Sequence, residues 1–521
     1  MKTFVGIVQD SHEAWERNAA VMDIVYGHSC LTICAADGED AHAGLLAMST
    51  AREKTLARQH IEQCGPELEL MVKHPCELYV QKSKWSTRGW TFQERLLSRR
   101  VLLFAEGRVY WQCCATTMSE EVDMESAISG RAIDVESSPM QSFEDMAVNP
   151  IEGYKNSVNQ YTIRSLKHET DILAAFQGIG KLNGGFMGGQ LIHGLPNTHF
   201  DWALLWEPED SCRPRKAKKG HPPFPSWSWC GWAERPTKYT DQTFNALQDN
   251  LHDWLHEHCW INYYIRDGGG NLRLVWDAKL HKSANEKLDR RLRGYRAPPP
   301  DTVDYDNYGR EIKGPMIGLP RTEFTRTTPD FAMQVRTIPM GEVDQDPEAR
   351  AEDRNMLQFF TWSAYLYLEP ESQEQPVSKD SHLAGRIHSR RYKILDATRT
   401  WQGTIVLDHR LRFNPKTPQH FIALSDAKQF SSAERSVRDR HTRRKDWTLY
   451  YVLLLGYDEE PGSATPNTHK WSSHDSTDLE GRIAKRIGLG KVDQTAFHPF
   501  HHSCSTFEQP DGTTWREIIL G

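Results

Sequence analysis

Residues 84–111 read KWSTRGWTFQERLLSRRVLLFAEGRVYW, and this stretch decides the fold of the N-terminal region. Apolar side chains recur at helical spacing in residues 91–97, so this segment is predicted to be a short helix. The next two segments, residues 100–104 and 108–112, alternate apolar side chains as strands do, and a Glu-Gly pair lies between them. The sequence therefore predicts a helix that leads into a β-hairpin.

The region upstream of this stretch carries further helix and strand signals. Residues 10–26 are predicted to form a helix, because Asp10 and Glu13 fit a capping box and apolar residues line one face. Residues 31–36 are predicted to be a buried strand that ends at an Asp-Gly pair. Residues 52–63 are expected to form a second helix. Together these elements predict an α/β domain.

Residues 87–98 resemble the end of the fungal heterokaryon incompatibility (HET) domain, whose members share a Thr-Arg-Gly-Trp-Thr-x-Gln-Glu-Arg-x-Leu-Ser core. The residues that fit are Thr87, Arg88, Gly89, Trp90, Thr91, Gln93, Glu94, Arg95, Leu96, Leu97 and Ser98. Residues 9–45 resemble the middle of the same domain. The resemblance implies a HET domain over residues 1–119, and HET domains are thought to resemble the TIR fold.

The first residues depart from the family's pattern. HET domains normally open with Ser-Tyr-Cys-Trp-Gly and later carry Trp-Ile-Asp-x-x-Cys-Ile, and residues 1–8 contain neither. The domain is therefore expected to be partial, incomplete at its N-terminus, and a sheet that lacks its first strand would leave backbone groups unpaired. A truncated gene model and a degenerate copy both remain open as explanations.

Length and composition limit the classes of protein. A chain of 521 residues is long enough for two or three domains. Its net charge of -7, from 63 basic and 70 acidic residues, provides no overall field for nucleic acid. No apolar run is long enough for a membrane span, and ten irregularly spaced cysteines are typical of reduced thiols. A soluble, cytoplasmic protein without nucleic-acid partners is predicted.

The rest of the chain is predicted to fall into four parts. Residues 120–152 are acidic and serine-rich and are expected to be a linker. Residues 153–284 are expected to be a helical region followed by tryptophan-rich strands, including a half-buried strand at 225–229. Residues 285–330 are predicted to be an exposed loop, and residues 331–521 a β-rich region. The resemblance to the family continues into this part, at Tyr161, Arg164, Leu166 and Asp171.

Three patterns invite a ligand-binding interpretation that the sequence does not support. Gly184-Gly185 and Gly188-Gly189 lack the Lys-Ser/Thr of a P-loop, so a flexible loop is predicted. Two groups of histidines and cysteines have no distant third ligand, and no metal site is predicted. These groups are His252, His256, His258 and Cys259, and His498, His501, His502 and Cys504.

The function implied by the resemblance is signalling: such proteins trigger incompatibility and cell death when fungal cells of unlike genotype fuse. Another protein, or a second copy of the chain, is then the expected partner, with no cofactor and no turnover. The alternative is a TIR-like NAD-cleaving enzyme, with NAD as substrate and Glu94 as the catalytic carboxylate. A structural ion pair of Glu94 with Arg88 or Arg95 is the other interpretation of this residue, and a non-functional copy is a third hypothesis for the chain.

Overall fold

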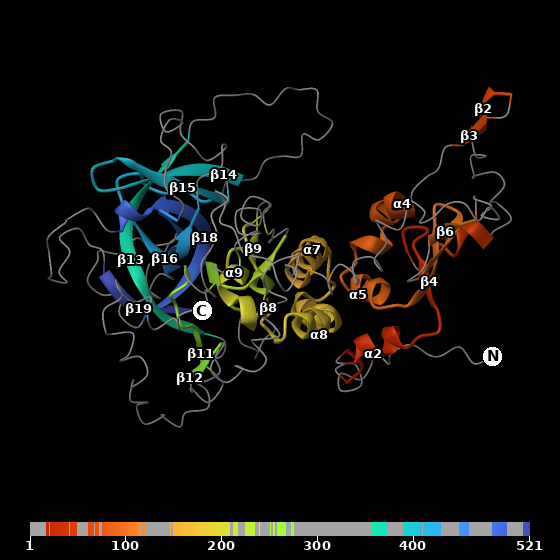
Figure 1. Ribbon diagram of the computed structural model, residues 1–521, viewed down its shortest axis with the longest axis horizontal. Helices are drawn as coiled ribbons and strands as arrows, with labels where there is room; N and C mark the ends of the chain where they lie inside the picture. Colours follow the sequence, from red (N-terminus) through yellow and green to blue (C-terminus); the bar gives the residue numbers. More distant parts are fainter. Residues whose placement is uncertain are drawn as a thin grey trace, which may run out of the picture. The chain divides into compact units, whose positions relative to one another are not determined.

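The computed structural model describes two compact units, residues 1–191 and residues 192–521 (Figure 1). In the first unit it describes residues 17–19, 21–40, 42–48, 61–66, 68–71, 76–113, 117–120, 146 and 149–191. In the second it describes residues 192–208, 212–216, 224–234, 239, 251, 254–255, 258–266, 272–275, 356–371, 389–408, 410–428, 447–457, 482–497 and 514–521. The boundaries expected from the sequence at 119, 152 and 284 stay a prediction.

The first unit contains a four-stranded sheet with the order β1-β4-β5-β6. Its strands are β1 (Thr32–Ala35), β4 (Arg100–Ala105), β5 (Arg108–Cys113) and β6 (Thr117–Ser119). The first pair is parallel, and the other two pairs are antiparallel. Glu106 and Gly107 join β4 to β5 with φ values of 52° and 72°, the left-handed conformation that a tight hairpin requires. The predicted hairpin is confirmed.

The unit contains the helices α2 (Met22–Gly27), α4 (Cys76–Lys82), α5 (Trp90–Leu96), α7 (Pro150–Thr162) and α8 (Gln177–Phe186). Helices α4 and α5 contact the four-stranded sheet, and α2, α7 and α8 pack against α5 or one another. Short 3-10 helices are η1 (Leu46–Met48), η2 (Trp85–Thr87), η4 (Glu169–Ile172) and η5 (Ala174–Phe176), and β2 (Ile61–Gly65) pairs with β3 (Leu68–Met71). The core between α4 and the sheet consists of Cys34, Ala36, Cys76, Val80, Val101, Leu103, Ala105 and Tyr110. The predicted helix at 91–97 and strand at 31–36 are confirmed within a residue at each end, but the expectation that this strand is buried is wrong, because Ile33 and Ala35 are exposed.

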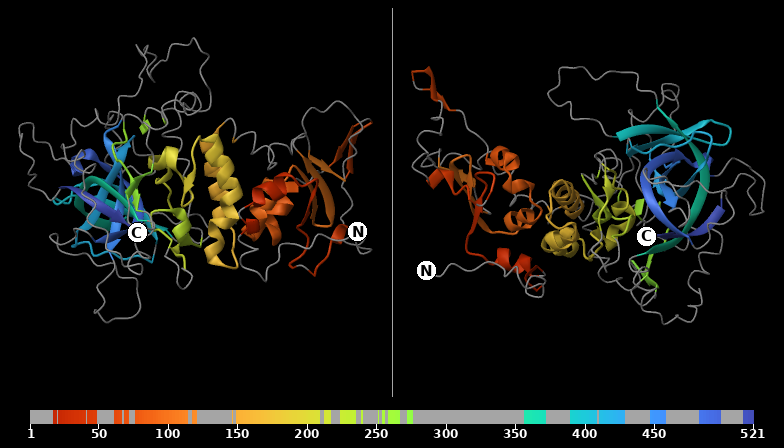
Figure 2. Two further views of the ribbon diagram at one scale, coloured as in Figure 1. Left: turned by 90° about the horizontal axis from the view of Figure 1, so that it is seen from below. Right: turned by 180° about the vertical axis from the view of Figure 1, so that it is seen from behind.

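The second unit is built on a sheet that closes on itself (Figure 2). Six strands form a ring in the order β13-β14-β15-β18-β17-β16, and β16 pairs again with β13. They are β13 (Leu357–Pro370), β14 (Ser389–Leu395), β15 (Trp401–Asp408), β16 (Gln419–Ala427), β17 (Leu449–Tyr457) and β18 (Ile483–Asp493). Apolar side chains fill the ring, among them Leu366, Ile394, Phe421 and Val452. The predicted β-rich C-terminal region is confirmed.

Glycines allow two strands of this ring to approach closely. A Cβ on Gly403 of β15 would lie 2.0 Å from the carbonyl oxygen of Lys491 on β18. A Cβ on Gly490 would lie 2.8 Å from the carbonyl oxygen of Thr404 on β15. Because no larger residue fits at either position, these glycines serve the curvature of a closed sheet.

Shorter elements of the second unit surround the ring. They are β8 (Leu195–Pro196), η6 (Asn197–His199), α9 (Phe200–Ala203), β9 (Arg213–Pro214), η7 (Trp229–Gly231), β10 (Trp232–Ala233), β11 (Tyr264–Arg266), β12 (Leu272–Leu274), η10 (Gln494–Ala496) and β19 (Thr514–Leu520). The small strand β7 (Leu191–Ile192) spans the division between the units and pairs with β8. Trp202, Trp206, Trp227, Trp229 and Trp254 are all fully buried here. The many tryptophans of the chain therefore supply core volume in this unit.

Several expectations from the sequence are wrong or fall outside the described residues. Residues 225–229 are not a strand: Ser228 N–H donates to Pro225 O, and the turn leads into η7. Gly184 and Gly185 belong to α8 and not to a loop. Ile61 and the next residues of the expected second helix form β2. Residues 1–16, 52–60, 121–145 and 285–330, on which other expectations rest, lie outside the described residues.

Candidate functional site

Helix α5 presents the predicted motif, and the motif's glycine fixes the beginning of this helix. Gly89 N–H donates to Ser165 O over 2.8 Å, and Ser165 N–H donates to Thr87 O over 2.6 Å. A Cβ on Gly89 would lie 2.4 Å from a methyl carbon of Leu166, so only glycine permits this approach without displacing Leu166. The motif is thereby joined to the segment that follows α7.

Aromatic and hydroxyl side chains of the motif strengthen this junction. Trp90 Nε1–H donates to Asp171 Oδ2 over 3.4 Å, and the Phe92 ring stacks on Tyr161 at 5.9 Å. Thr91 Oγ1 contacts the carbonyls of Trp85 and Arg88 at 2.8 Å, which closes the turn before α5. Residues 161–171, where the resemblance to the family continues, therefore contact the motif directly.

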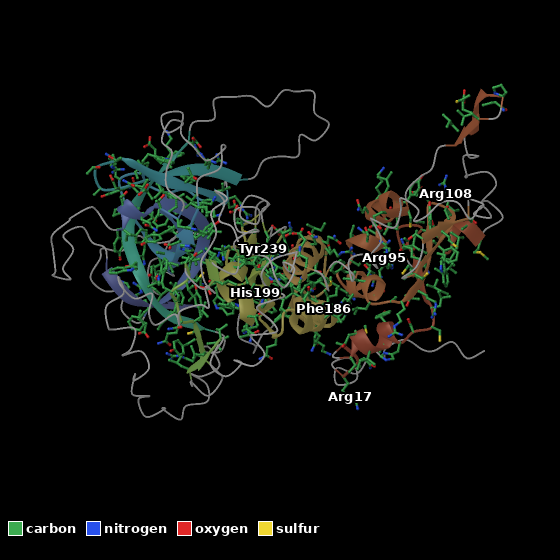
Figure 3. All side chains as sticks on the ribbon, viewed as in Figure 1. Arg17, Arg95, Arg108, Phe186, His199 and Tyr239 are labelled. Carbon is green, nitrogen blue, oxygen red and sulfur yellow. The ribbon has the colours of Figure 1, made fainter. Side chains whose placement is uncertain are left out.

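Arg95 is buried and forms a tight ion pair, but not with Glu94. Its guanidinium (Figure 3) donates to the two carboxylate oxygens of Glu77 on α4 over 3.2 and 2.8 Å. It also donates to Gln112 Oε1 of β5 over 2.9 Å. Arg95 thus ties α5 to α4 and to the sheet, and the expected ion pair of Arg95 with Glu94 is wrong.

Gln93 and Leu97 face inward on the opposite side of α5. Neither amide atom of Gln93 has a hydrogen-bond partner among the described residues, although the side chain is fully buried. A Cβ on Gly178 of α8 would lie 3.1 Å from Gln93 Oε1 and 2.7 Å from a methyl carbon of Leu97. This tight packing leaves no room beside Gly178 and indicates a packing role for both motif residues.

Glu94 is the motif residue whose surroundings are chemically unusual. Its half-buried carboxylate accepts a hydrogen bond from the Tyr26 hydroxyl of α2 and lies within the field of the exposed Arg88. Burial raises the pKa of the Glu94 carboxyl above its ordinary value, while the Arg88 charge and the Tyr26 hydrogen bond oppose part of that rise. Burial and the nearby Glu94 charge likewise raise the pKa of Tyr26. A perturbed carboxyl with a hydroxyl partner is typical of functional sites.

The Cys34 thiol, on which the Glu94 charge acts, is not poised to react. Cys34 lies on β1 and is buried, and burial raises its pKa to about 12, a rise to which Glu94 adds and which Arg95 opposes. A thiol that stays protonated is a poor nucleophile. The site can therefore offer a carboxylate for stabilising positive charge, but Cys34 does not supply a nucleophile.

Sequence reasoning missed the two partners that define the motif's environment, Tyr26 and Glu77. Tyr26 was expected on the inward face of the first helix, yet helical periodicity cannot indicate which residue of another helix it meets. Glu77 lies in a segment with no motif, 18 positions before Arg95. Only the packing of α2 and α4 against α5 brings both residues to the motif.

Part of the first unit matches a known protein family. The model of the family described as Heterokaryon incompatibility protein (HET) matches residues 4–94. This segment is similar to that family. The matched HET segment ends at Glu94, so it includes Tyr26 and the beginning of α5, whereas Arg95 and Ser165 lie beyond it. No curated protein and no solved structure matches the chain.

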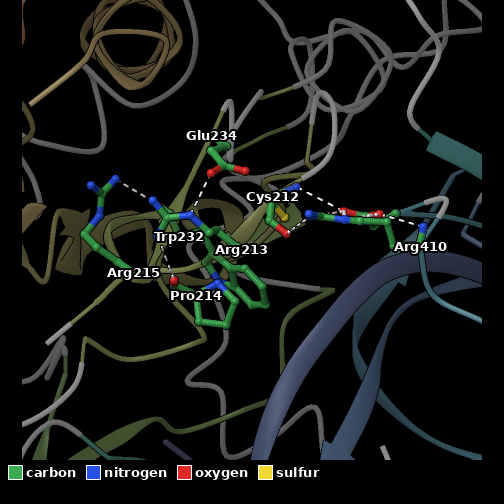
Figure 4. Close-up of polar contacts among 8 residues, drawn as sticks. Cys212, Arg213, Pro214, Arg215, Trp232, Glu234 and Arg410 are labelled. Carbon is green, nitrogen blue, oxygen red and sulfur yellow. Dashed lines mark hydrogen bonds and ion pairs between the residues drawn. The ribbon is translucent and has the colours of Figure 1, made fainter. Parts of the chain in front are cut away.

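A second polar cluster, in the second unit, joins parts of the chain that are distant in sequence. Arg410 donates to Cys212 O over 2.7 Å and pairs with Asp408, and Arg213 pairs with Glu234 over 2.7 Å (Figure 4). Burial raises the pKa of the Cys212 thiol to about 12. The cluster's charges are matched among themselves, which indicates a structural tie.

The histidine groups do not form a metal site in the part of the chain that the structure describes. Of the first group, His258 bonds Asp426 Oδ2 through Nδ1 over 2.8 Å and stacks on Trp447 at 4.0 Å. No three metal-ligating side chains gather among the described residues, and the second histidine group lies outside them. Within the same ranges, no helix has the length and apolarity needed to cross a bilayer.

Proposed function

We propose that this protein is a HET-family signalling protein whose first unit acts by associating with a second copy of the chain. The match of residues 4–94 to the HET family supports this proposal. Gly89 through its backbone, and Trp90 and Arg95 through their side chains, hold α5 against its neighbours and so are occupied within the unit. Such a motif suits an interaction module, which needs a well-ordered surface more than a dense set of reactive groups.

The observation that carries the proposal is the surface around β1. Among the described residues, β1 has a strand neighbour on one side only, β4. Ile33 on this edge strand is 61% exposed, and Ile24 and Val25 of the preceding α2 are 53% and 48% exposed. An open strand edge beside apolar side chains is a template for strand pairing with another chain.

A second copy is the partner that this surface fits. Thr32–Ala35 carries no charge, so antiparallel pairing of two β1 strands about a two-fold axis brings no like charges together. Natural sheets protect open edges with lysine, proline or a bulge, and β1 has none of these. The same patch on both subunits then gives a closed dimer.

The test measures the oligomeric state of the full-length protein by sedimentation and light scattering. The wild type is expected to form dimers, and Ile33→Lys is expected to raise the dissociation constant at least tenfold, about 1.4 kcal/mol. Met118→Lys is the matched control, because Met118 is 44% exposed on β6, the opposite edge of the same sheet. A monomeric wild type at tens of micromolar, or equal effects of both variants, would exclude the β1 interface.

A second function is favoured by the surroundings of Glu94. We propose, as the alternative, that the site cleaves NAD: water attacks the ribose carbon, the bond from that carbon to nicotinamide breaks, and ADP-ribose, nicotinamide and a proton result. A carboxylate held beside the reacting carbon stabilises the positive charge that develops on the ribose. The burial of Glu94, its Tyr26 partner and the neighbouring Arg88 support this assignment.

Purified full-length protein is the sample for this test. Consumption of NAD by the wild type and its loss in Glu94→Gln, with unchanged circular dichroism and thermal unfolding, are the expected results. Glu77→Gln is a control that changes a carboxylate on α4 without touching Glu94. No consumption by an oligomeric wild-type sample would exclude the alternative and leave the signalling proposal standing.

A further inference from the structure

Tyr26 and Glu94 are connected twice, once through their side chains and once through their backbones. The side-chain connection is the interaction of the Tyr26 hydroxyl with the Glu94 carboxylate, which the packing of α2 against α5 brings together. The backbone connection runs through three hydroxyl groups. Ser98 Oγ donates to Glu94 O over 2.5 Å, and Ser29 Oγ donates to Tyr26 O over 2.8 Å.

Thr32, the first residue of β1, completes this second connection. Its hydroxyl oxygen lies 2.7 Å from Ser98 Oγ and 3.0 Å from Ser29 Oγ. Because Ser29 and Ser98 each donate their proton to a backbone carbonyl, Thr32 donates its one proton to either serine oxygen, and only one of these two contacts is a hydrogen bond at a time. The end of α2, the beginning of β1 and the end of α5 are thus joined in a closed loop of polar contacts.

The loop limits where the two side chains can go. A tyrosine on a six-residue helix would otherwise have little to hold its orientation, because short helices depend on tertiary contacts. Here Ser29 fixes the backbone of Tyr26 and Ser98 fixes the backbone of Glu94, at the point where each side chain leaves its helix. The direction of the carboxylate is then set by the Tyr26 hydroxyl.

We propose that Tyr26 is a positioning residue that orients the Glu94 carboxylate, and that the hydroxyls of Ser29, Thr32 and Ser98 hold this pair in register. The inference deepens the NAD-cleaving function proposed above, and its activity measurement rests on that function. The positioning role itself does not rest on that function, since the contacts that carry it lie within the folded unit. Tyr26, Ser29 and Thr32 gain a role that no motif assigned to them.

The decisive measurement is the titration of Glu94 in the full-length protein by carbon NMR of labelled glutamate, with Glu94→Gln identifying the signal. Because the Tyr26 hydrogen bond lowers the pKa of Glu94, Tyr26→Phe is expected to raise that pKa further. Tyr161→Phe is the matched control: it removes another buried hydroxyl of the same unit, which donates to Ile172 O over 2.6 Å. It is expected to leave the Glu94 titration unchanged.

An unchanged Glu94 titration in Tyr26→Phe would overturn the inference. A shift of the same size in Tyr161→Phe would also overturn it, because a general loosening of the unit would then explain both results. Thr32→Val supplies a second variant that keeps Tyr26 itself: it is expected to shift the Glu94 titration in the same direction and by less. This variant preserves the test if Tyr26→Phe fails to fold.

Activity separates this inference from the function on which it rests. If the wild type consumes NAD, Tyr26→Phe is expected to lower kcat on the order of tenfold and to shift the acidic limb of the pH profile, with KM little changed. If the wild type consumes no NAD and Tyr26→Phe still shifts the Glu94 titration, the NAD-cleaving function fails and the positioning role stands. Consumption with an unshifted titration and an unshifted pH profile overturns the positioning role alone.

Discussion

Two buried guanidinium groups, Arg95 in the first unit and Arg486 in the second, are stabilised in opposite ways. Arg95 meets a carboxylate, that of Glu77, and a neutral amide oxygen from Gln112. Among the described residues, Arg486 on β18 forms no ion pair, although the charge of Glu207 acts on it: it donates to the carbonyls of Leu204 and Trp206 and lies 3.8 Å from the centre of the Trp206 ring. Burial lowers the pKa of Arg486 to about 9.

The difference indicates how well each unit tolerates substitution of its buried arginine. A charge held by a side chain can be compensated, because the partner can be substituted along with it. A charge held by backbone carbonyls cannot, because the carbonyls remain after any substitution. We therefore expect the second unit to depend more strongly on Arg486 than the first does on the ion pair of Arg95.

Arg486→Met should produce the largest effect. The variant keeps most of the side-chain volume but leaves the Leu204 and Trp206 carbonyls buried without donors, at a cost of about 4 kcal/mol. Denaturant unfolding followed by hydrogen exchange in peptides of α9 and β18 measures this loss in the second unit. Lys485→Met is the control, since the neighbouring side chain is only half-buried. Equal losses in the two variants would contradict the assigned role of Arg486.

Arg95→Met is expected to cost less, about 3 kcal/mol, because Glu77 is partly exposed and regains water when its partner is lost. The same exchange measurement, now on peptides of α4 and α5, follows this change in the first unit. Adding Glu77→Met should recover most of the loss, since both charges are then absent. A double variant no more stable than Arg95→Met alone would show that the two side chains are not energetically coupled.

In the first unit, the local sequence pattern predicted α5 and the β4–β5 hairpin because their signals lie within a few residues, but it predicted a helix where Ile61 begins β2. Helical spacing before Leu97 and the Glu-Gly pair after Phe104 were enough for α5 and the β4–β5 hairpin. The site around Glu94 was predicted only in its central residue. Tyr26 lies 68 positions away and Ser165 lies 71 positions away, and no local pattern reports contacts over such separations.

In the second unit, the local sequence pattern correctly predicted a β-rich region over residues 331–521 and failed at residues 225–229, where the chain turns. Alternating Trp227 and Trp229 imitate a strand, but a Cβ on Gly231 would lie 2.3 Å from Pro225 O. The chain folds back on itself at this point, and only the glycine permits it. In the first unit, Gly184 was wrongly predicted to lie in a loop: it belongs to α8, where a Cβ would meet Gly189 O at 2.9 Å. Each glycine serves a close approach that depends on the tertiary structure.

A buried histidine extends the comparison, because it too meets neutral partners in the second unit. His420 on β16 bonds the Tyr457 hydroxyl through Nδ1 over 2.7 Å and stacks on Tyr365. Burial, helped by the positive charge of Arg516, lowers the pKa of His420 from 6.5 to about 3. The unfolded chain therefore binds a proton at a pH where the folded unit does not.

The sign of this effect follows from the lowered pKa. The stability of the second unit should be complete above pH 6.5 and fall as the pH drops, with a loss of about 2 kcal/mol by pH 5 that is due to His420. His420→Gln should remove that slope from denaturant unfolding measured between pH 7 and 5. His28→Gln changes an exposed imidazole of the first unit and should leave the slope in place. If His420→Gln retained the slope, the buried base would not be the group that couples this unit to pH, and the contrast between the two units would reduce to Arg95 and Arg486.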